Sequence, residues 1–535
     1  MKLLKRNLPR DSVHSVEGTE NEPIPAPFLP LIFALLFFAQ MTGKSFYGYT
    51  KGEWVKLVVS YFIFFVFGAV EASEGVYYGL MKTELEIPYN IQGYLVSAGS
   101  WSFIIGSPIL GMLMSYTDVK PILVGAFVSY FVAYCILYNV RTLWVVFILL
   151  FIEGLGGVGL DVGMNTLSTV LFTSHRGVMM SYLHFFYGMG SMMGPEYASI
   201  MLTFWNRGYR GIFLGLMIPV VLGVVVSLLS RLSLKEKEPL PAQEGSIKES
   251  SVDSVGDKGA NSVLSSSDDS KAQAPGQAQA PVQVQDQAPV KDSKPELPLK
   301  ADSVNVEIKN SPAHTPSHSS VWKSFLSPMV WLLGLNMGAV YAIESITVNW
   351  GPLYLHDLYG MKIEEEGSRF LSLFYLFYTV ARLGTGFIID FFGDIASMVG
   401  FNVVLIVLYL VAFSLGRNGV WLLAGSGLLI SPFYPTSITV PMQVFGEKAQ
   451  NTISVILCIS CMVNLLIQVL MGHINDAFGA AWGYRILAIA MCVLMIVCLL
   501  IANCSLRRTA KKPTSNDSSK KEREEAVQKS EPLAA

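Results

Sequence analysis

The sequence predicts an all-α polytopic membrane protein, with twelve transmembrane helices in two pseudo-symmetric six-helix bundles. Three observations lead to this fold class. The chain of 535 residues is 52% hydrophobic and only 15% charged, whereas a soluble domain carries about 25% charged residues. Most charges gather in three polar stretches, at residues 1–26, 233–323 and 506–535. The apolar blocks between these stretches are long enough to cross a bilayer, which takes about 20 residues.

Each long apolar block is expected to be a helix, because backbone amides cannot remain unpaired in hydrocarbon. Short connections with turn-forming residues, such as Gly208 and Gly419, separate the blocks. Six predicted spans precede the central polar stretch, at residues 56–80, 90–115, 119–139, 143–172, 177–204 and 211–232. Six more follow it, at residues 325–357, 366–392, 397–415, 419–445, 450–477 and 484–505.

The spans define two predicted bundles, an N-terminal one at residues 56–232 and a C-terminal one at residues 324–505. Between them, residues 233–323 are rich in Ala, Gln, Pro and Ser. Such a segment cannot bury enough apolar surface to offset its ordering entropy, so we expect a disordered linker. Residues 506–535 form a disordered tail. An even number of spans places both chain ends on one side, and flanking Lys and Arg residues favour the cytoplasm for that side.

The N-terminal region, residues 1–55, contains a short apolar segment at residues 27–41. This segment is too short to span a bilayer comfortably. We expect it to lie in the membrane interface; the alternative is a thirteenth span, which would move the N-terminus to the other side. A signal peptide is not expected, because the preceding region is long and contains acids such as Asp11 and Glu17.

Acidic residues lie well inside several predicted spans. Glu71 and Glu74 fall on the first span, Glu153 and Asp161 on the fourth, and Glu344 on the seventh. An ionised acid in the middle of a bilayer costs about 2.5–3.5 kcal/mol on insertion scales, so such residues usually mark a proton site or a water-filled path. No basic residue lies near the middle of these three spans. The acids are therefore candidates for substrate and proton binding, with hydrogen-bonded structural acids as the alternative.

An internal repeat places two of these acids at matching positions. Residues 68–74 read GAVEASE and residues 338–344 read GAVYAIE, so five of seven positions agree and both segments end in glutamate. Such repeats are typical of transporters. Glu71 and Glu74 stand three residues apart on one predicted helix face, where two negative charges would repel. We expect one of them to hold a proton, which favours proton coupling; sodium remains an alternative driving ion.

Further side chains on the spans are candidates for the same site. Asn165 follows Asp161 by one helical turn, so both project from one side of the fourth span. His184 on the fifth span is a candidate to relay protons or bind a hydroxyl, with a plain core role as the alternative. Trp350 on the seventh span is a candidate to stack on a sugar-like ring, with packing or an interfacial belt as the alternative. No metal or cofactor is expected.

Five motifs on the spans match one known group of transporters. In chain order they read Asp161-x3-Asn165 after a glycine-rich run, Leu183-His184-Phe185-x-x-Gly188-x-Gly190, Glu344-x5-Trp350-x3-Tyr354-Leu355, Ala381-Arg382-Leu383-x-x-Gly386-x3-Asp390-x-x-Gly393, and Ser431-Pro432-x-Tyr434-Pro435. They resemble the fucose permease branch of the major facilitator superfamily, which includes sugar:proton symporters. The resemblance covers all twelve predicted spans. The long linker and tails suggest a eukaryotic member, with a fungal one as the narrower reading.

The resemblance implies a secondary active transporter that works by alternating access on a small hydrophilic, sugar-like solute, coupled to protons. In this family an acid on the first helix and one on the fourth take part in proton coupling and substrate binding, and these positions fall on Glu74 and Asp161. Arg382, Gly386 and Asp390 match the loop motif that latches the cytoplasmic ends during alternating access.

Two other functions stay open: a transporter-like nutrient sensor that signals through its cytoplasmic loop, and a lipid or amphiphile transporter. An enzyme is not expected, because the chain has no P-loop, metal-ligand cluster or nucleophile elbow, and the glycine pattern at residues 154–159 lies inside an apolar span. A net charge of −2 does not indicate a nucleic-acid partner. The expected partners are a small-molecule substrate and the lipid bilayer, and the expected state is a monomer. The plasma membrane and a vacuolar or other organellar membrane both remain open.

Overall fold

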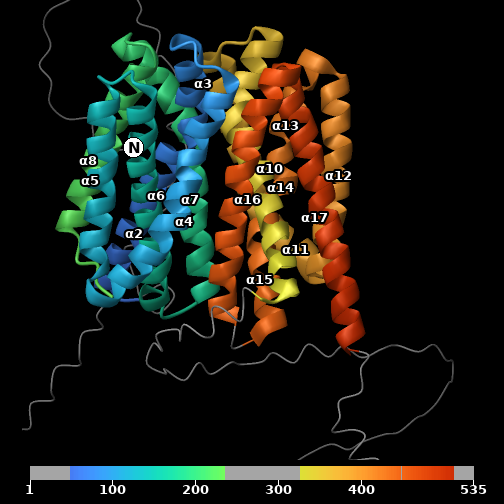
Figure 1. Ribbon diagram of the computed structural model, residues 1–535. Coiled ribbons are helices and arrows are strands. Elements are labelled where there is room, and N and C mark those ends of the chain that lie inside the picture. Colours follow the sequence, from blue (N-terminus) through green and yellow to red (C-terminus); the bar gives the residue numbers. More distant parts are fainter. Residues whose placement is uncertain (1–48, 235–325, 447–448, 511–535) are drawn as a thin grey trace, which may run out of the picture. The chain divides into compact units, whose positions relative to one another are not determined.

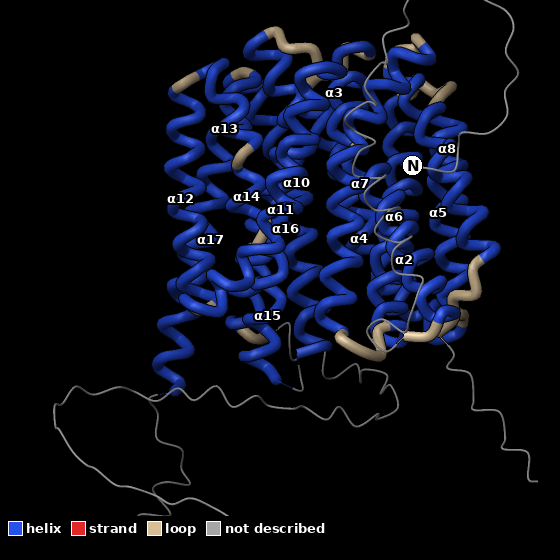
Figure 2. The backbone as a smooth tube through the Cα atoms, turned by 180° about the vertical axis from the view of Figure 1, so that it is seen from behind, coloured by secondary structure: helices blue, strands red, loops and turns tan. Residues whose placement is uncertain are grey.

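The computed structural model describes residues 49–234, 326–446 and 449–510. The predicted interfacial segment at residues 27–41, nearly all of the predicted linker and residues 511–535 lie outside the described part. Every regular element within the described residues is a helix, and no strand occurs among them (Figure 2). The predicted all-α fold class is therefore confirmed.

We call residues 49–234 the N-half and residues 326–510 the C-half. The helices of the N-half are α2 (Lys51–Ala72), α3 (Glu74–Glu84), α4 (Tyr89–Tyr116), α5 (Val119–Leu137), α6 (Leu143–Leu171), α7 (Arg176–Trp205) and α8 (Tyr209–Leu229). The elements of the C-half are α10 (Pro328–Tyr359), the π-helical turn η2 (Ile363–Gly367), α11 (Ser368–Phe392), α12 (Asp394–Ser414), the 3₁₀ turn η3 (Gly416–Gly419), α13 (Val420–Ala424), α14 (Ser426–Ile430), α15 (Phe433–Phe445), α16 (Ala449–Phe478) and α17 (Ala480–Ala510). The predicted bundle boundaries at residues 232 and 324 stay a prediction.

Ten helical spans among the described residues are long and apolar enough to cross a membrane. Two predicted spans are not among them. The fifth, α7, carries polar side chains such as His184 and Glu196 along its length. The tenth consists of the three shorter helices α13, α14 and α15, which meet at Gly425 and at Ser431–Pro432. A proline has no backbone N–H to continue the ladder, which accounts for the second interruption. Both segments pack against α11, and the arrangement agrees with the predicted twelve spans.

The first span differs from its prediction at both ends and in the middle. Its helix begins at Lys51 instead of residue 56 because Thr50 and Glu53 form a capping box. It also continues to Glu84, past the predicted end at residue 80. The helix is interrupted at Ser73, whose hydroxyl donates to the carbonyl oxygens of Ala69 at 2.8 Å and Gly194 at 3.0 Å. The last span also runs further than predicted, to residue 510 instead of 505.

The helices α2 and α7 pack with their backbones in contact. A Cβ atom at Gly190 would lie 1.9 Å from the carbonyl oxygen of Phe65, and one at Gly194 would lie 2.1 Å from that of Ala69. Only glycine permits this approach, a packing mode that is common between membrane helices. The contact fixes α7 against the segment of the first span that carries Glu71.

The two halves meet along α4 and α16, along α7 and α11, and along α3 and α10 (Figure 1). We call the end of the bundle where α8 finishes and α10 begins the linker end, and the opposite end, which holds residues 85–88 and 360–362, the far end. Glycines allow close approach between the halves. A Cβ atom at Gly75 would lie 2.1 Å from the carbonyl oxygen of Val348, and one at Gly472 would lie 2.3 Å from that of Tyr89.

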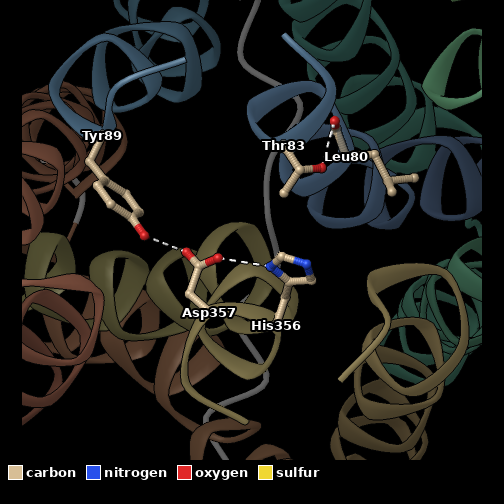
Figure 3. A network of polar contacts seen from close by, with 5 residues as sticks. All are labelled: Leu80, Thr83, Tyr89, His356 and Asp357. Carbon is tan, nitrogen blue, oxygen red and sulfur yellow. Dashed lines mark hydrogen bonds and ion pairs between the residues drawn. The ribbon is translucent and has the colours of Figure 1, made fainter. Parts of the chain in front are cut away.

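Polar contacts at the far end join the halves, and we call them the far-end seam. The Asp476 carboxylate of α16 accepts hydrogen bonds from the backbone N–H groups of Tyr89 at 3.0 Å and Asn90 at 2.8 Å, at the N-terminus of α4. The Tyr89 hydroxyl donates to Asp357 near the end of α10, and Asp357 also contacts the His356 ring at 2.8 Å (Figure 3). The seam therefore links the start of α4 to the ends of α10 and α16.

Candidate functional site

Glu71 lies at the end of α2, where the close packing against α7 brings Tyr187 to it. The Tyr187 hydroxyl donates to Oε2 of Glu71 at 2.6 Å. The side chain of Glu71 is half-buried. Asp161 of the N-half and Glu344 of the C-half lie within electrostatic reach of its carboxylate. Glu71 thus faces the interface between the two halves.

Glu74 opens α3, directly after the interruption at Ser73. The backbone of Ser73 remains right-handed, with φ −71° and ψ −16°, so the chain changes direction little at this point. Within the part of the chain that the structure describes, the Glu74 carboxylate has no hydrogen-bond partner. Glu153 and Glu71 are its nearest acidic neighbours in electrostatic terms. The expected proximity of Glu71 and Glu74 is therefore present, although a helix break separates them.

Asp161 and Asn165 stand one turn apart on α6, and their side chains are hydrogen-bonded. Asn165 Nδ2 donates to Asp161 Oδ1 at 2.8 Å, and both side chains keep partial exposure. Tyr434 on α15 and Cys461 on α16 lie within electrostatic reach of the Asp161 carboxylate. Both residues belong to the C-half, so Asp161 also faces the interface between the halves.

Glu344 belongs to a three-residue hydrogen-bond chain in the C-half. The Tyr378 hydroxyl donates to Glu344 Oε2 at 3.1 Å, and a terminal nitrogen of Arg382 donates to the same hydroxyl at 2.9 Å. The Arg382 guanidinium also lies over the Tyr378 ring, 4.6 Å from its centroid. Tyr378 therefore separates the acid from the base.

The residues of the predicted latch motif lie at different depths along α11. Arg382 lies eight residues before Asp390 on α11, which is about 12 Å along a helix axis. Gly386 and Asp390 are exposed toward the linker end, whereas Arg382 is half-buried beside Glu344. Motif spacing alone does not indicate how deep a helical residue lies, so the sequence grouped Arg382 with the helix end.

His184 and Trp350 occupy different surroundings. His184 is half-buried on α7, packs edge-on against the Phe64 ring at 5.7 Å, and lies within electrostatic reach of Arg382 in the other half. Trp350 is only 1% exposed, and its Nε1 donates to Gln468 at 2.7 Å. The indole of Trp350 is therefore closed off from solvent in this conformation, whereas His184 lies near the acids and Arg382.

Glu153 on α6, one of the candidate acids, lies apart from the others in a buried site of its own. Its side chain is 2% exposed. Tyr77 of α3 and Tyr134 of α5 both donate to Oε1, at 2.9 Å and 2.7 Å, whereas Oε2 is buried without a hydrogen-bond partner. The two tyrosines stand far apart in the chain, so no local pattern in the sequence indicates this arrangement.

The site as a whole combines carboxyl groups from both halves with one guanidinium. Glu71, Asp161 and Glu344 are half-buried and interact electrostatically across the interface. Among the described residues, none of these carboxylates has a cationic partner within 4.0 Å, since the ion pairs found there involve Asp357 and Glu365. Groups of this kind can bind protons, or bind hydroxyl and amino groups of a solute.

The profile of the Major Facilitator Superfamily matches residues 60–462, about three quarters of the chain. The chain belongs to the Major Facilitator Superfamily. Together with the ten membrane-crossing helical spans among the described residues, this family makes it an integral multi-pass membrane transporter and not an enzyme. No curated protein matches the sequence.

Several solved transporters share this fold at low sequence identity. A variant of the nucleoside transporter NupG is 12% identical with a TM-score of 0.58, covering 85% of this chain and 99% of its own. An inward-facing bacterial homolog of the human lysosomal transporter Spinster is 12% identical with a TM-score of 0.62, covering 87% and 100%. A variant of the E. coli fucose:proton symporter FucP is 12% identical with a TM-score of 0.52, covering 84% and 99%. At these identities the likeness shows the fold alone.

Proposed function

We propose that this transporter moves a small hydrophilic, sugar-like solute by alternating access, coupled to protons. One observation carries the proposal: Glu71, Asp161 and Glu344, from both halves, keep partial exposure and interact with each other without a direct cationic partner in the described residues. The site is formed by the two halves of one chain, so the proposal takes the monomer as the transport unit.

Proton coupling follows from the mutual repulsion of these acids. Removal from water and nearby negative charge both favour the neutral form of a carboxyl group. The site closes away from water in each transport cycle. Proton uptake before closure lowers the number of charges that are buried, and so lowers the free-energy cost of closing. Sodium is the alternative driving ion, since carboxylates bind both.

The direction of opening is inferred from the contacts between the halves. The Asp476 bonds and the Gly472 contact join the halves at the far end. A hydrogen bond from Asn464 Nδ2 to Ser100 Oγ at 2.9 Å continues the junction toward the middle of α4 and α16. We take this as the state that is closed at the far end. With both chain ends in the cytoplasm, as proposed from the sequence, this state opens inward.

A sugar-like solute fits the aromatic and hydroxyl groups beside the acids. Tyr187 and Tyr378 bond to Glu71 and Glu344, and Tyr375 packs edge-on against Tyr378 at 6.2 Å. Phenols and carboxylates both hydrogen-bond to hydroxyl groups. Solved transporters of this fold include a fucose:proton symporter and a D-xylose-proton symporter, which adds support without fixing the substrate.

Uptake into proteoliposomes tests the proposal. The full chain would be assayed with a panel of sugars and polyols, with and without an inward proton gradient, beside Glu74→Gln and Asp161→Asn. We expect the gradient to stimulate uptake, and at least one variant to lose this stimulation while still exchanging solute across the membrane. Glu365→Gln, an exposed acid outside the site, is the matched control and should behave as wild type. A wild-type uptake rate that is the same with and without the proton gradient would reject proton coupling.

A further inference from the structure

Arg382 brings a positive charge into a group of acids without pairing directly with any of them. It lies in the interior of α11, fourteen residues after Ser368 and ten before Phe392. Across the interface, His184 and Tyr187 of α7 lie within its electrostatic reach, and Tyr434 of α15 lies within reach from its own half. The guanidinium therefore belongs to the interface that holds the site.

The hydrogen-bonding capacity of Arg382 is largely unused. Its one hydrogen bond among the described residues runs from a terminal nitrogen to the Tyr378 hydroxyl at 2.9 Å. Its Nε is buried without a partner, and no carboxylate in the described residues lies within 4.0 Å of the guanidinium. A guanidinium carries five N–H donors in a rigid fork. A charge that is removed from water is normally paired and hydrogen-bonded, so this half-buried guanidinium has the donors to bind an anion.

Glu344 does not supply that anion, because Tyr378 stands between the two charges. The phenol accepts from Arg382 and donates to Glu344 at 3.1 Å. The acid is thus two hydrogen bonds away from the base, which leaves most of the guanidinium's donors available. Planar bidentate recognition of a carboxylate is the interaction for which arginine is best suited.

We propose that Arg382 binds a carboxylate group of the transported solute, so that the substrate is a hydroxylated carboxylic acid, such as a sugar acid, instead of a neutral sugar. This inference rests on the proposed function and names the substrate class of the same site. The incoming carboxylate also places a negative charge near Glu344, which favours uptake of a proton by that acid. One carboxylate and one proton then cross together without net charge.

Matched substrate pairs test the inference. Uptake of galacturonate would be compared with galactose, and gluconate with glucitol, because each pair differs in a carboxylate against a hydroxymethyl group. Wild type should take up the acids at least about 10-fold faster, as expected for a charge-assisted hydrogen-bonded pair. Arg382→Gln should lose most of this preference and Arg382→Lys should recover part of it, since lysine keeps the charge without the fork. Arg369→Gln, an exposed arginine on the same helix, should keep the preference.

A second measurement does not depend on a folded variant. Ligands that bind the native state raise its melting temperature, so galacturonate should stabilise the purified wild type and galactose should not. Equal stabilisation by both, or an unchanged acid preference in Arg382→Gln, would overturn the inference. If wild type carries neutral sugars with the proton gradient at least as fast as the acids, the proposed function stands and the inference fails. If it carries none of the four solutes and none of the wider panel, the proposed function fails as well.

Discussion

Glu153 illustrates how a buried carboxyl group depends on single hydrogen bonds for its stabilisation. Its Oε1 accepts from Tyr77 and Tyr134, which belong to α3 and α5, while Oε2 has no partner. The three residues tie three helices of the N-half together within the membrane. Loss of one phenol leaves the carboxyl with a single donor, and a buried polar group that loses its partner destabilises the fold.

Tyr134→Phe should therefore lower the free energy of unfolding by about 1–3 kcal/mol. Thermal unfolding of the purified protein, followed by reactivity of buried cysteines such as Cys492, measures the change. Tyr116→Phe, at a strongly exposed tyrosine, is the matched control and should leave stability unchanged. Equal stability of the two variants would mean that Glu153 does not depend on this bond.

The sequence predicted single residues well where a local rule applied and poorly where distant segments meet. Helical spacing alone predicted that Asn165 would lie beside Asp161, and it does. The Tyr134–Glu153 bond joins two different helices, and nothing local marks such a pair. The sequence did not indicate that Arg382 bonds to Tyr378 beside Glu344, because its motif runs on to the helix end and the partners come from packing; its role in the latch motif stays a prediction.

The start of α4 shows how one element depends on the other half of the molecule. The first N–H groups of a helix have no partner within the helix, and that end carries partial positive charge. Here the carboxylate of Asp476 from α16 satisfies two of them. A cap that comes from the opposite half is lost when the far end opens, so it stabilises only the closed state.

Asp476→Ala should shift the population toward the state that is open at the far end, by about 5-fold for a typical cap of about 1 kcal/mol. Spin labels at positions 86 and 478, on opposite sides of the far-end seam, would report the change as a longer distance. Glu365→Ala, at an exposed acid that takes no part in the far-end seam, should leave the distances unaltered. Unchanged distances in Asp476→Ala would show that the cap does not hold the seam.

At the scale of single helices, the sequence predicted the number and type of helices better than their continuity. The length of an apolar segment determines whether it crosses the membrane as a helix, because unpaired amides are excluded from hydrocarbon. The interruption at Ser73 depends on a contact instead. Ser73 bonds to the carbonyl of Gly194 on another helix, and such a partner is invisible in a single segment.

At the scale of the whole molecule, the described helices of the two halves contact each other extensively. The two halves meet through α4 with α16, α7 with α11 and α3 with α10. A covalent linker between two units that already bind each other affects their association mainly through its loop entropy, and this entropy changes slowly with linker length.

A chain that lacks residues 240–315 should therefore transport solute within about 2-fold of the wild-type rate. Proteoliposome uptake measures this directly, with the full chain reconstituted at the same protein density as the control. Loss of uptake would assign the linker a direct part in transport. Intact uptake with a lost cellular response to the solute would instead support an added sensor role.

The close packing at Gly472 affects which substitutions such a protein can accept during evolution. Its Cα lies so close to the Tyr89 carbonyl that a methyl group would clash while the far end is closed, whereas the clash is relieved once the halves part. A substitution there acts on one of two conformations, and therefore on their ratio. Selection would act on mutations at Gly472 mainly through the fraction of time that the transporter is open to each side of its membrane, and only secondarily through whether it folds.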